Sequence, residues 1–275
     1  MDEIIWRGMT RAQLDAAYNN TAAVKNSAEK LADWSRRSAL LRGRAGVLLD
    51  LTYGPRPRNR IDIFPNGRWR APLFVFIHGG YWQRNSKEIF GCVAGGPLAR
   101  GFDVALVGYT LAPEATLTEI VGEVHAAMRW LRAEGPRLGI ATGKLVVSGW
   151  SAGGHLTAVA LPEADAGLAI SGIFDLEPCR LNYLNEALKI TLDEQVNLSP
   201  IRQLLSRSPP LVIAFGTAEL PELQRQSRDY YSMREAAKLP TELLALEGHD
   251  HFSILEELAS PTGQLTDCLT HLIKD

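Results

Sequence analysis

Short, uninterrupted apolar runs separated by helix-like segments are the feature that most limits what this chain can fold into. Runs without polar alternation are typical of strands buried on both faces, as in a parallel sheet. Segments with helical periodicity separate most of the runs, and this alternation predicts one doubly wound α/β domain. The predicted strands are residues 73–77, 103–107, 145–148, 167–170, 211–215 and 242–246, and the predicted helices are residues 117–134, 152–161, 222–238 and 262–273.

Other segments flank or interrupt this alternation. Residues 47–53 and 60–64 show partial polar alternation around a turn, which predicts an exposed antiparallel pair at a sheet edge. Residues 10–42 are polar with intermittent apolar positions, and they predict a helical arm on the main domain or over its active site. Residues 174–208 break the pattern and predict a cap insertion of short helices where α/β proteins build pockets. We therefore expect a single domain over residues 1–275 with this arm and this cap.

Composition excludes several classes of protein. A hydrophobic content of 46% with 22% charged residues is ordinary for a soluble globular domain. A net charge of −2 gives no electrostatic reason to bind nucleic acid or a membrane. The three cysteines lack metal-ligand spacing and are odd in number, which favours a reduced compartment. With no visible secretory signal or membrane-spanning run, we expect a cytoplasmic protein without a metal site. The sequence leaves open whether it forms a homodimer.

The strongest chemical signal is a G-x-S-x-G motif, which reads G-W-S-A-G at residues 149–153. It lies directly between a predicted strand and a predicted helix, the context in which this motif forms a nucleophile elbow. The turn is so tight that small residues must flank the serine. The amino terminus of the following helix favours negative charge that develops nearby. Ser151 is therefore the predicted nucleophile.

A serine hydroxyl is a weak nucleophile until a base takes its proton. In enzymes with this elbow, the chain order is serine, then an acid, then histidine. His251 follows the last predicted strand and precedes a short helix, which is the expected position of the base. His249 is the nearest alternative. We favour His251 as the general base.

The acid that orients the histidine should follow the strand at residues 211–215, because it comes before the histidine in chain order. The loop after that strand contains Glu219 and Glu222 and no aspartate. Glu222 fits the first turn of a helix, where the helix dipole favours carboxylates. Asp250 is a remote alternative, since it is too close in sequence to the histidine to orient its ring easily. We favour Glu219.

The oxyanion that forms during acyl transfer needs hydrogen-bond donors. The stretch H-G-G-Y-W at residues 78–82 follows a predicted strand, where a glycine-rich loop supplies backbone N–H groups. We assign the N–H groups of Gly80, Tyr81 and Ala152 to the oxyanion hole. We interpret His78 as a residue that fixes the loop and does not transfer protons.

Aromatic residues near this loop are candidates for the substrate pocket. Trp82 adjoins the predicted oxyanion hole, and we assign it to substrate binding. From position alone, Tyr183 or Trp34 could add to an aromatic slot. Trp150 and His155 are interpreted as packing residues around the elbow.

The chain resembles the arylformamidase (kynurenine formamidase) group of the α/β-hydrolase superfamily. The stretches that carry the resemblance are H-G-G-Y-W (78–82), Y-T-L-A-P-E (109–114), G-W-S-A-G-G (149–154), G-I-F-D-L (172–176), E-L-P-E-L-Q-R-Q-S (219–227), D-H-F (250–252) and, in the arm, Y-N-N (18–20). The first is the most specific, because related esterases usually carry a third glycine where Tyr81 stands. The resemblance implies a mostly parallel central sheet with helices on both faces and a small helical cap.

The resemblance also implies a reaction, the hydrolysis of an N-formyl aryl amide such as N-formylkynurenine. Ser151, Glu219 and His251 would act through an acyl-enzyme, and no metal or organic cofactor is needed. Members of the group usually carry an aspartate where Glu219 stands, and this chain departs from that pattern. The expected partner is a small aromatic amide or ester.

Other functions are compatible with parts of this sequence. Within hydrolases, the alternative is a carboxylesterase or amidase that acts on short acyl or aryl esters or amides. A ligand receptor on the same fold is a different class, but such proteins tend to lose the histidine that His251 supplies here. A scaffold protein finds no support in charge runs or exposed apolar repeats.

Overall fold

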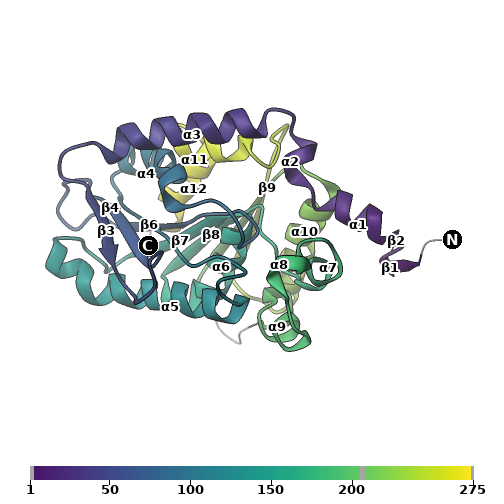
Figure 1. The fold of residues 1–275 in the computed structure, drawn as a ribbon. Coiled ribbons are helices and arrows are strands. Elements are labelled where there is room, and N and C mark those ends of the chain that lie inside the picture. The colour runs from purple at the N-terminus through teal and green to yellow at the C-terminus, as the bar shows by residue number, and fades with distance from the viewer. Residues whose placement is uncertain (1–2, 205–207, 274–275) are drawn as a thin grey trace.

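The computed structural model describes residues 3–204 and 208–273, and an eight-stranded sheet forms its centre (Figure 1). All the predicted apolar runs are parallel strands of this sheet: β5 (Leu73–Ile77), β6 (Asp103–Val107), β7 (Leu145–Trp150), β8 (Ala166–Ile170), β9 (Leu211–Gly216) and β10 (Thr241–Leu246). The order across the sheet is β10-β9-β8-β7-β5-β6-β4-β3. The direction of winding reverses at β5, and a ligand crevice is expected at such a reversal.

The edge pair differs in one respect from the prediction. Strands β3 (Leu48–Thr52) and β4 (Arg60–Phe64) are antiparallel and lie at one end of the sheet, as predicted. Strand β4 is not exposed, however, and its residues 61–64 are buried. The reason is that β4 also pairs with β6, so only β3 of this pair is an edge strand. Strand β10 is the edge strand at the other end of the sheet, and its residues 242 and 245 are exposed, so the prediction of burial on both faces was wrong for this strand.

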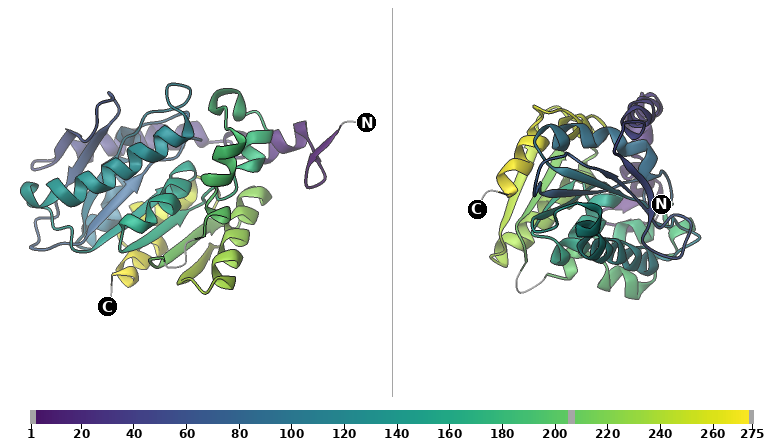
Figure 2. Two further views of the ribbon diagram at one scale, coloured as in Figure 1. Left: turned by 90° about the horizontal axis from the view of Figure 1, so that it is seen from below. Right: turned by 90° about the vertical axis from the view of Figure 1, so that its left-hand side faces the viewer.

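Helices cover both faces of the sheet (Figure 2). The predicted helices are α5 (Leu117–Glu134), α6 (Ala152–Ala160), α10 (Pro221–Ala236) and α12 (Gln264–Leu272). Side chains of β5 alternate between two apolar cores. Val75 packs in the core with α5, α6 and α10, and Phe74 and Phe76 pack in the core with α12 and the arm. This two-sided burial explains the unbroken apolar runs, and the predicted α/β-hydrolase fold is confirmed.

Shorter helices connect these elements. They are η1 (Lys87–Ala94), α4 (Gly95–Ala99), η2 (Gly135–Leu138), η3 (Leu161–Glu163), η5 (Ser253–Leu255) and α11 (Glu256–Ala259). The first two fill the connection between β5 and β6, for which the sequence pattern predicted no helix.

The region predicted as an arm contains α1 (Arg11–Ala17), α2 (Asn20–Ala23) and α3 (Ser27–Arg42), and the short strands β1 (Ile4–Trp6) and β2 (Met9–Thr10) precede them. Helix α3 runs across one helical layer of the domain in Figure 1. The Ser38 hydroxyl donates to the Ile89 carbonyl and accepts from the Cys92 N–H, both at 2.8 Å, which fixes α3 on η1. Residues 18 and 19 lie between α1 and α2, and residue 20 begins α2 and lines a cavity together with residues that follow β9 and β10.

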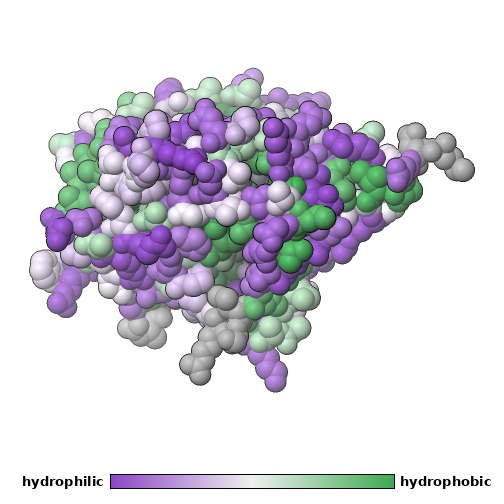
Figure 3. All heavy atoms as spheres, turned by 60° about the horizontal axis from the view of Figure 1, so that its bottom comes forward, coloured by the Kyte–Doolittle hydropathy of each residue, from purple (hydrophilic) through white to green (hydrophobic). Residues whose placement is uncertain are grey.

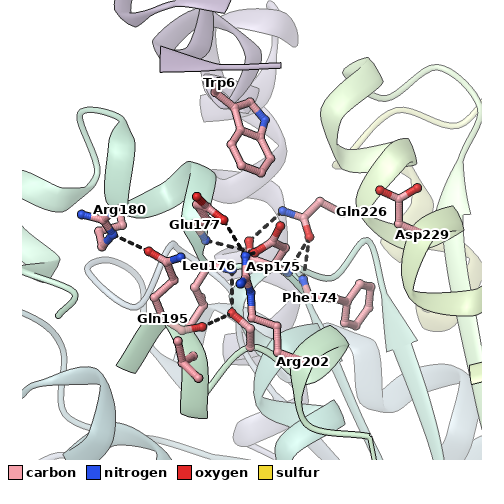
Figure 4. A network of polar contacts seen from close by, with 12 residues as sticks. Trp6, Phe174, Asp175, Leu176, Glu177, Arg180, Gln195, Arg202, Gln226 and Asp229 are labelled. Carbon is pink, nitrogen blue, oxygen red and sulfur yellow. Dashed lines mark hydrogen bonds and ion pairs between the residues drawn. The ribbon is translucent and has the colours of Figure 1, made fainter. Parts of the chain in front are cut away.

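The region predicted as a cap contains α7 (Glu177–Leu181), α8 (Asn185–Leu188), α9 (Leu192–Asn197) and η4 (Pro200–Arg202); residues 205–207 of the prediction lie outside the described residues. Polar contacts hold its two ends together (Figure 4). Arg202 forms ion pairs with Asp175 and Glu177. Gln226 of α10 accepts from the N–H groups of Phe174 and Asp175 and donates to the Asp175 carbonyl. The cap is therefore anchored to α10.

Several general features accompany this architecture. On the face drawn in Figure 3, hydrophobic groups are interspersed among hydrophilic ones. Within residues 3–204 and 208–273, no helix combines the length and hydrophobicity needed to cross a membrane. In the same ranges, no cluster of three or more acidic, histidine or cysteine side chains is arranged to hold a metal ion. The three cysteines are buried and unpaired with one another.

Candidate active site

The G-W-S-A-G motif forms a sharp turn between β7 and α6. Ser151 has a φ of 59° and a ψ of −118°, a strained conformation that clusters at functional sites. Small residues are required around it. A Cβ on Gly149 would lie 2.3 Å from the Gly153 carbonyl oxygen, and one on Gly153 would lie 2.0 Å from the Ile77 carbonyl oxygen. The Ser151 N–H donates to the Ile170 carbonyl at 2.8 Å, which ties the turn to the neighbouring strand.

The H-G-G-Y-W loop lies against this turn. A Cβ on Gly79 would lie 2.6 Å from the Trp150 carbonyl oxygen and 3.0 Å from the Ser151 Cβ. The next three residues all have positive φ, 122° at Gly80, 51° at Tyr81 and 58° at Trp82. Because L side chains rarely adopt such values, the loop conformation must be held by its surroundings.

Backbone N–H groups near the serine lack acceptors. Among the hydrogen bonds between described residues, none uses the N–H of Gly80, Tyr81 or Ala152. Ala152 is the first residue of α6, so its N–H has no partner within the helix. Buried backbone donors are nearly always paired, so unpaired donors beside a strained serine are available for a ligand oxygen.

The structure brings Glu219 and His251 together. Glu219 Oε2 lies 2.8 Å from His251 Nδ1, and both side chains are almost fully buried. A carboxylate can only accept, so Nδ1 carries the proton and Nε2 is left free to accept one. The other carboxylate oxygen, Oε1, accepts from the Ser171 hydroxyl and from the Gly216 N–H, each at 2.6 Å. This buried charge is therefore stabilised by three hydrogen bonds.

Packing places the histidine beside the elbow. The His251 ring lies 4.8 Å from the Trp150 ring, centroid to centroid. The Trp150 indole N–H donates to the His251 carbonyl at 2.7 Å. Trp150 immediately precedes Ser151, so this contact fixes the histidine loop against the turn that carries the serine.

The alternative candidates have other partners. His249 faces Glu257, with 3.5 Å between Nε2 and Oε1. Asp250 accepts from the N–H groups of Phe252 and Ser253; although partial burial acts to raise its pKa, these hydrogen bonds keep the pKa below the ordinary value. Glu222 is held by an ion pair with Arg225 on α10. None of these three residues therefore takes part in a buried carboxylate–histidine hydrogen bond like that of Glu219 and His251.

The other predicted aromatic and histidine residues are buried around the site. Trp82 is fully buried, and its ring meets the His155 ring edge to face at 5.1 Å. His155 donates from Nε2 to the Leu198 carbonyl at 2.8 Å, while Trp34 packs in the core beneath the elbow. Burial lowers the pKa of His155 to about 4, so its ring is neutral near pH 7.

His78 has the structural position that the sequence predicted. Its Nδ1 lies 2.9 Å from the Gly79 carbonyl oxygen, and its ring stacks on the Tyr109 ring at 4.3 Å. Burial lowers the pKa of His78 to about 4. The geometry therefore matches a neutral residue that fixes the glycine loop.

A cavity of about 400 Å³ adjoins the histidine and the acid. Its lining comes from the arm, from the loop after β9 and from the loop that carries His251, and it includes Asn20, Lys25, Glu219, Leu220, Asp250 and His251. Tyr183 of the cap is half-buried and faces the arm, with its hydroxyl 3.5 Å from the Tyr18 carbonyl oxygen. The space beside His251 is thus bounded partly by the arm.

Sequence reasoning missed the residues that support this arrangement. Ser171 follows β8 directly and has a φ of 50°, and a serine at the end of a buried strand was the available signal. Tyr18 and Asn20 contact the glycine loop through the Tyr81 hydroxyl. Nothing in the sequence pattern indicates that these two residues of the arm lie close to residue 81.

Several known proteins are similar to this chain in sequence. The BD-FAE family matches residues 61–168. The kynurenine formamidase of Danio rerio is 29% identical over 98% of both chains, and that of Drosophila melanogaster is 27% identical over 82% of both. Esterase LipC of Mycobacterium tuberculosis is 26% identical, over 74% of this chain and 59% of its own length.

Solved structures share the fold. A candidate thioesterase of Silicibacter sp. TM1040 superposes with a TM-score of 0.84 at 29% identity, covering 94% of this chain and 99% of its own. An esterase of Pyrobaculum calidifontis superposes with a TM-score of 0.75 at 19% identity, over 95% and 97% of the two chains. The chain therefore has the α/β-hydrolase fold and is similar to kynurenine formamidases along nearly its whole length.

Proposed function

We propose that the protein is a serine hydrolase that cleaves N-formyl aryl amides of the N-formylkynurenine type. The observation that carries the proposal is the buried Glu219–His251 hydrogen bond, packed against the elbow that holds Ser151. The similarity to kynurenine formamidases along nearly the whole chain supports the formamide as substrate. The coarser part of the proposal, hydrolysis of an ester or amide, is supported by the esterase relatives as well.

In the first half of the reaction, the Ser151 hydroxyl attacks the formyl carbon while His251 Nε2 takes its proton. The carbonyl oxygen becomes an oxyanion held by the N–H groups of Gly80, Tyr81 and Ala152. Collapse of this intermediate breaks the C–N bond, and His251 returns the proton to the leaving aryl amine. The serine is left as a formyl ester.

In the second half, water attacks the formyl ester and loses a proton to His251. The same N–H groups hold the second oxyanion. As the bond between the carbon and the Ser151 oxygen breaks, His251 returns its proton to that oxygen, and formic acid leaves and ionises to formate. Glu219 keeps the imidazole in the tautomer that accepts at Nε2 and stabilises the imidazolium that forms in each half. Every proton in the cycle is transferred by the chain's own residues or by water.

Parts of the single domain would bound the substrate. In this proposal, the arm of residues 10–42 and the cap of residues 174–208 border the site, and the cavity beside His251 supplies the approach. Trp82 stays a predicted substrate contact. Its indole N–H is buried without a partner between described residues, so this donor is not committed to another group of the protein.

The test is steady-state hydrolysis of N-formylkynurenine beside 4-nitrophenyl acetate, with Ser151→Ala as the blank. We expect a much higher kcat/KM for the formamide, and its loss in the variant. Activity that survives in Ser151→Ala would refute the serine mechanism. The second candidate function is a carboxylesterase, favoured by the match to esterase LipC. Fast ester cleavage with a negligible formamide rate would establish it.

A further inference from the structure

The Tyr81 side chain connects the glycine loop to the N-terminal arm. Its hydroxyl lies 2.6 Å from the Tyr18 carbonyl oxygen and 2.9 Å from Asn20 Nδ2. All three residues are nearly inaccessible to solvent, with exposed fractions of 5% or less. Tyr18 directly follows α1 and Asn20 begins α2, and both are more than sixty positions away from Tyr81 in sequence.

The direction of each hydrogen bond is determined by the groups present. A carbonyl can only accept, so the Tyr81 hydroxyl proton points at Tyr18. The hydroxyl oxygen must therefore accept from Asn20, which fixes the orientation of the Asn20 carboxamide. The other end of that carboxamide, Oδ1, is buried without a partner among the described residues. A buried unpaired oxygen costs stability, so an asparagine here is not explained by stability alone.

The backbone N–H of Tyr81 has no hydrogen-bond partner among the described residues. Tyr81 is the middle one of three consecutive residues with positive φ, a conformation that persists only when the surroundings impose it. Gln83 and Arg84 N–H groups bond the Gly80 carbonyl and close the turn on one side. On the other side, the side chain of Tyr81 is held by the arm.

The arm segment is itself fixed to the body of the domain. The Tyr18 hydroxyl accepts from Gln226 Nε2 at 2.9 Å and lies 3.3 Å from Glu222 Oε2. Both partners lie on α10, the helix that begins two residues after Glu219. The arm therefore links the glycine loop to the element that follows the acid.

We propose that Tyr18 and Asn20 are positioning residues, which hold the Gly80 and Tyr81 N–H groups toward the oxyanion through the Tyr81 hydroxyl. The inference rests on the proposed function, because it assumes an oxyanion hole at this loop. It goes beyond that function because it assigns the N-terminal arm a role in the rate of the catalysed reaction. Removing the Tyr81 hydroxyl would allow the loop to relax from its strained conformation. The N–H groups of Gly80 and Tyr81 would then no longer point toward the oxyanion.

The test compares Tyr81→Phe with a matched control, Tyr53→Phe. The Tyr53 hydroxyl donates to the Gly108 carbonyl at 2.6 Å and accepts from Asn59 Nδ2 at 3.3 Å, so the same kinds of bonds are lost away from the site. We expect kcat to fall about 10- to 100-fold in Tyr81→Phe with KM within about twofold, because a small misplacement of catalytic groups costs about that much. Tyr53→Phe should keep the wild-type kcat.

A second readout separates positioning from stability. An aryl trifluoromethyl ketone adds the Ser151 oxygen to its carbonyl carbon and places the resulting oxyanion in the hole, whereas the aryl amine product does not. In Tyr81→Phe the ketone should bind more weakly by the same factor as kcat falls, and the product should bind as in the wild type. Thermal unfolding should shift equally in both tyrosine variants. If Tyr81→Phe does not fold, Asn20→Ala takes its place in the same comparison.

Each outcome decides the inference. A Tyr81→Phe enzyme with wild-type kcat, an increase in KM alone, or an equal loss in Tyr53→Phe would overturn it. Failure of the proposed function has a different signature, since the wild type would then show no Ser151-dependent hydrolysis and the ketone would not bind it.

Discussion

Replacing Glu219 with glutamine removes one negative charge from the site with almost no change of shape. In the wild type, Oε1 accepts from the Gly216 N–H and the Ser171 hydroxyl, and Oε2 accepts from His251. The Gly216 N–H can only donate, so the glutamine must keep its carbonyl oxygen there and turn its NH₂ group toward His251. His251 must then accept at Nδ1 and carry its proton on Nε2, where it cannot take the proton of Ser151.

The size of the effect follows from this wrong tautomer. We expect kcat to fall by about 10³- to 10⁴-fold, the scale known for the equivalent change in a serine protease. At about 1.36 kcal/mol per tenfold, this is roughly 4 to 5.5 kcal/mol of activation free energy. The assay is steady-state hydrolysis of N-formylkynurenine, with the urea-unfolding midpoint as the check that Glu219→Gln is folded.

A matched variant separates the effect of the lost charge and the wrong tautomer from the effect of one lost hydrogen bond. Ser171→Ala removes one of the bonds to Oε1 but leaves the carboxylate and the Gly216 N–H in place. We expect Ser171→Ala to lose less than about tenfold in kcat, the equivalent of one neutral hydrogen bond. The reasoning is refuted if Glu219→Gln retains more than about a tenth of wild-type activity, or if Ser171→Ala loses as much.

Three further predictions concern stability. Gly79→Ala puts a Cβ 2.6 Å from a backbone carbonyl oxygen of the elbow and should lower the free energy of unfolding by about 1 to 3 kcal/mol, and an unchanged urea midpoint would contradict this. Burial lowers the pKa of His78 and His155 to about 4 from 6.5, so the unfolded chain binds their protons more readily. Their contribution is complete above pH 6.5 and is lost as the pH falls toward 4, by up to roughly 3 kcal/mol per histidine; a flat profile in urea titrations over this range would argue against it. Lys87→Met removes a buried ammonium 2.7 Å from fully buried Asp62, which keeps Arg42 as its remaining cationic partner, and should cost about 1.5 to 3 kcal/mol in chemical unfolding; an unchanged unfolding midpoint would contradict this.

Much of the fold could be predicted from the sequence because local chemistry determines it. The apolar runs were predicted to be strands buried on both faces. All six are parallel strands of the sheet and five are fully buried, whereas β10 lies at an edge and is partly exposed. The elbow was predictable because the steric demands around Ser151 act within a few residues. The exposure predicted for strand β4 was wrong, because its burial depends on pairing with β6, whose partner residues are forty or more positions away.

The candidate site divides in the same way. Chain order and loop position led to Ser151, Glu219 and His251 as the predicted site residues, because each follows a recognisable strand. Only the tertiary structure decided what surrounds them. Ser171 and the Gly216 N–H complete the bonds of Glu219, and the arm reaches the glycine loop through Tyr81. Such contacts join segments whose separation along the chain follows no period, so the distance between them is set by packing and not by any local pattern.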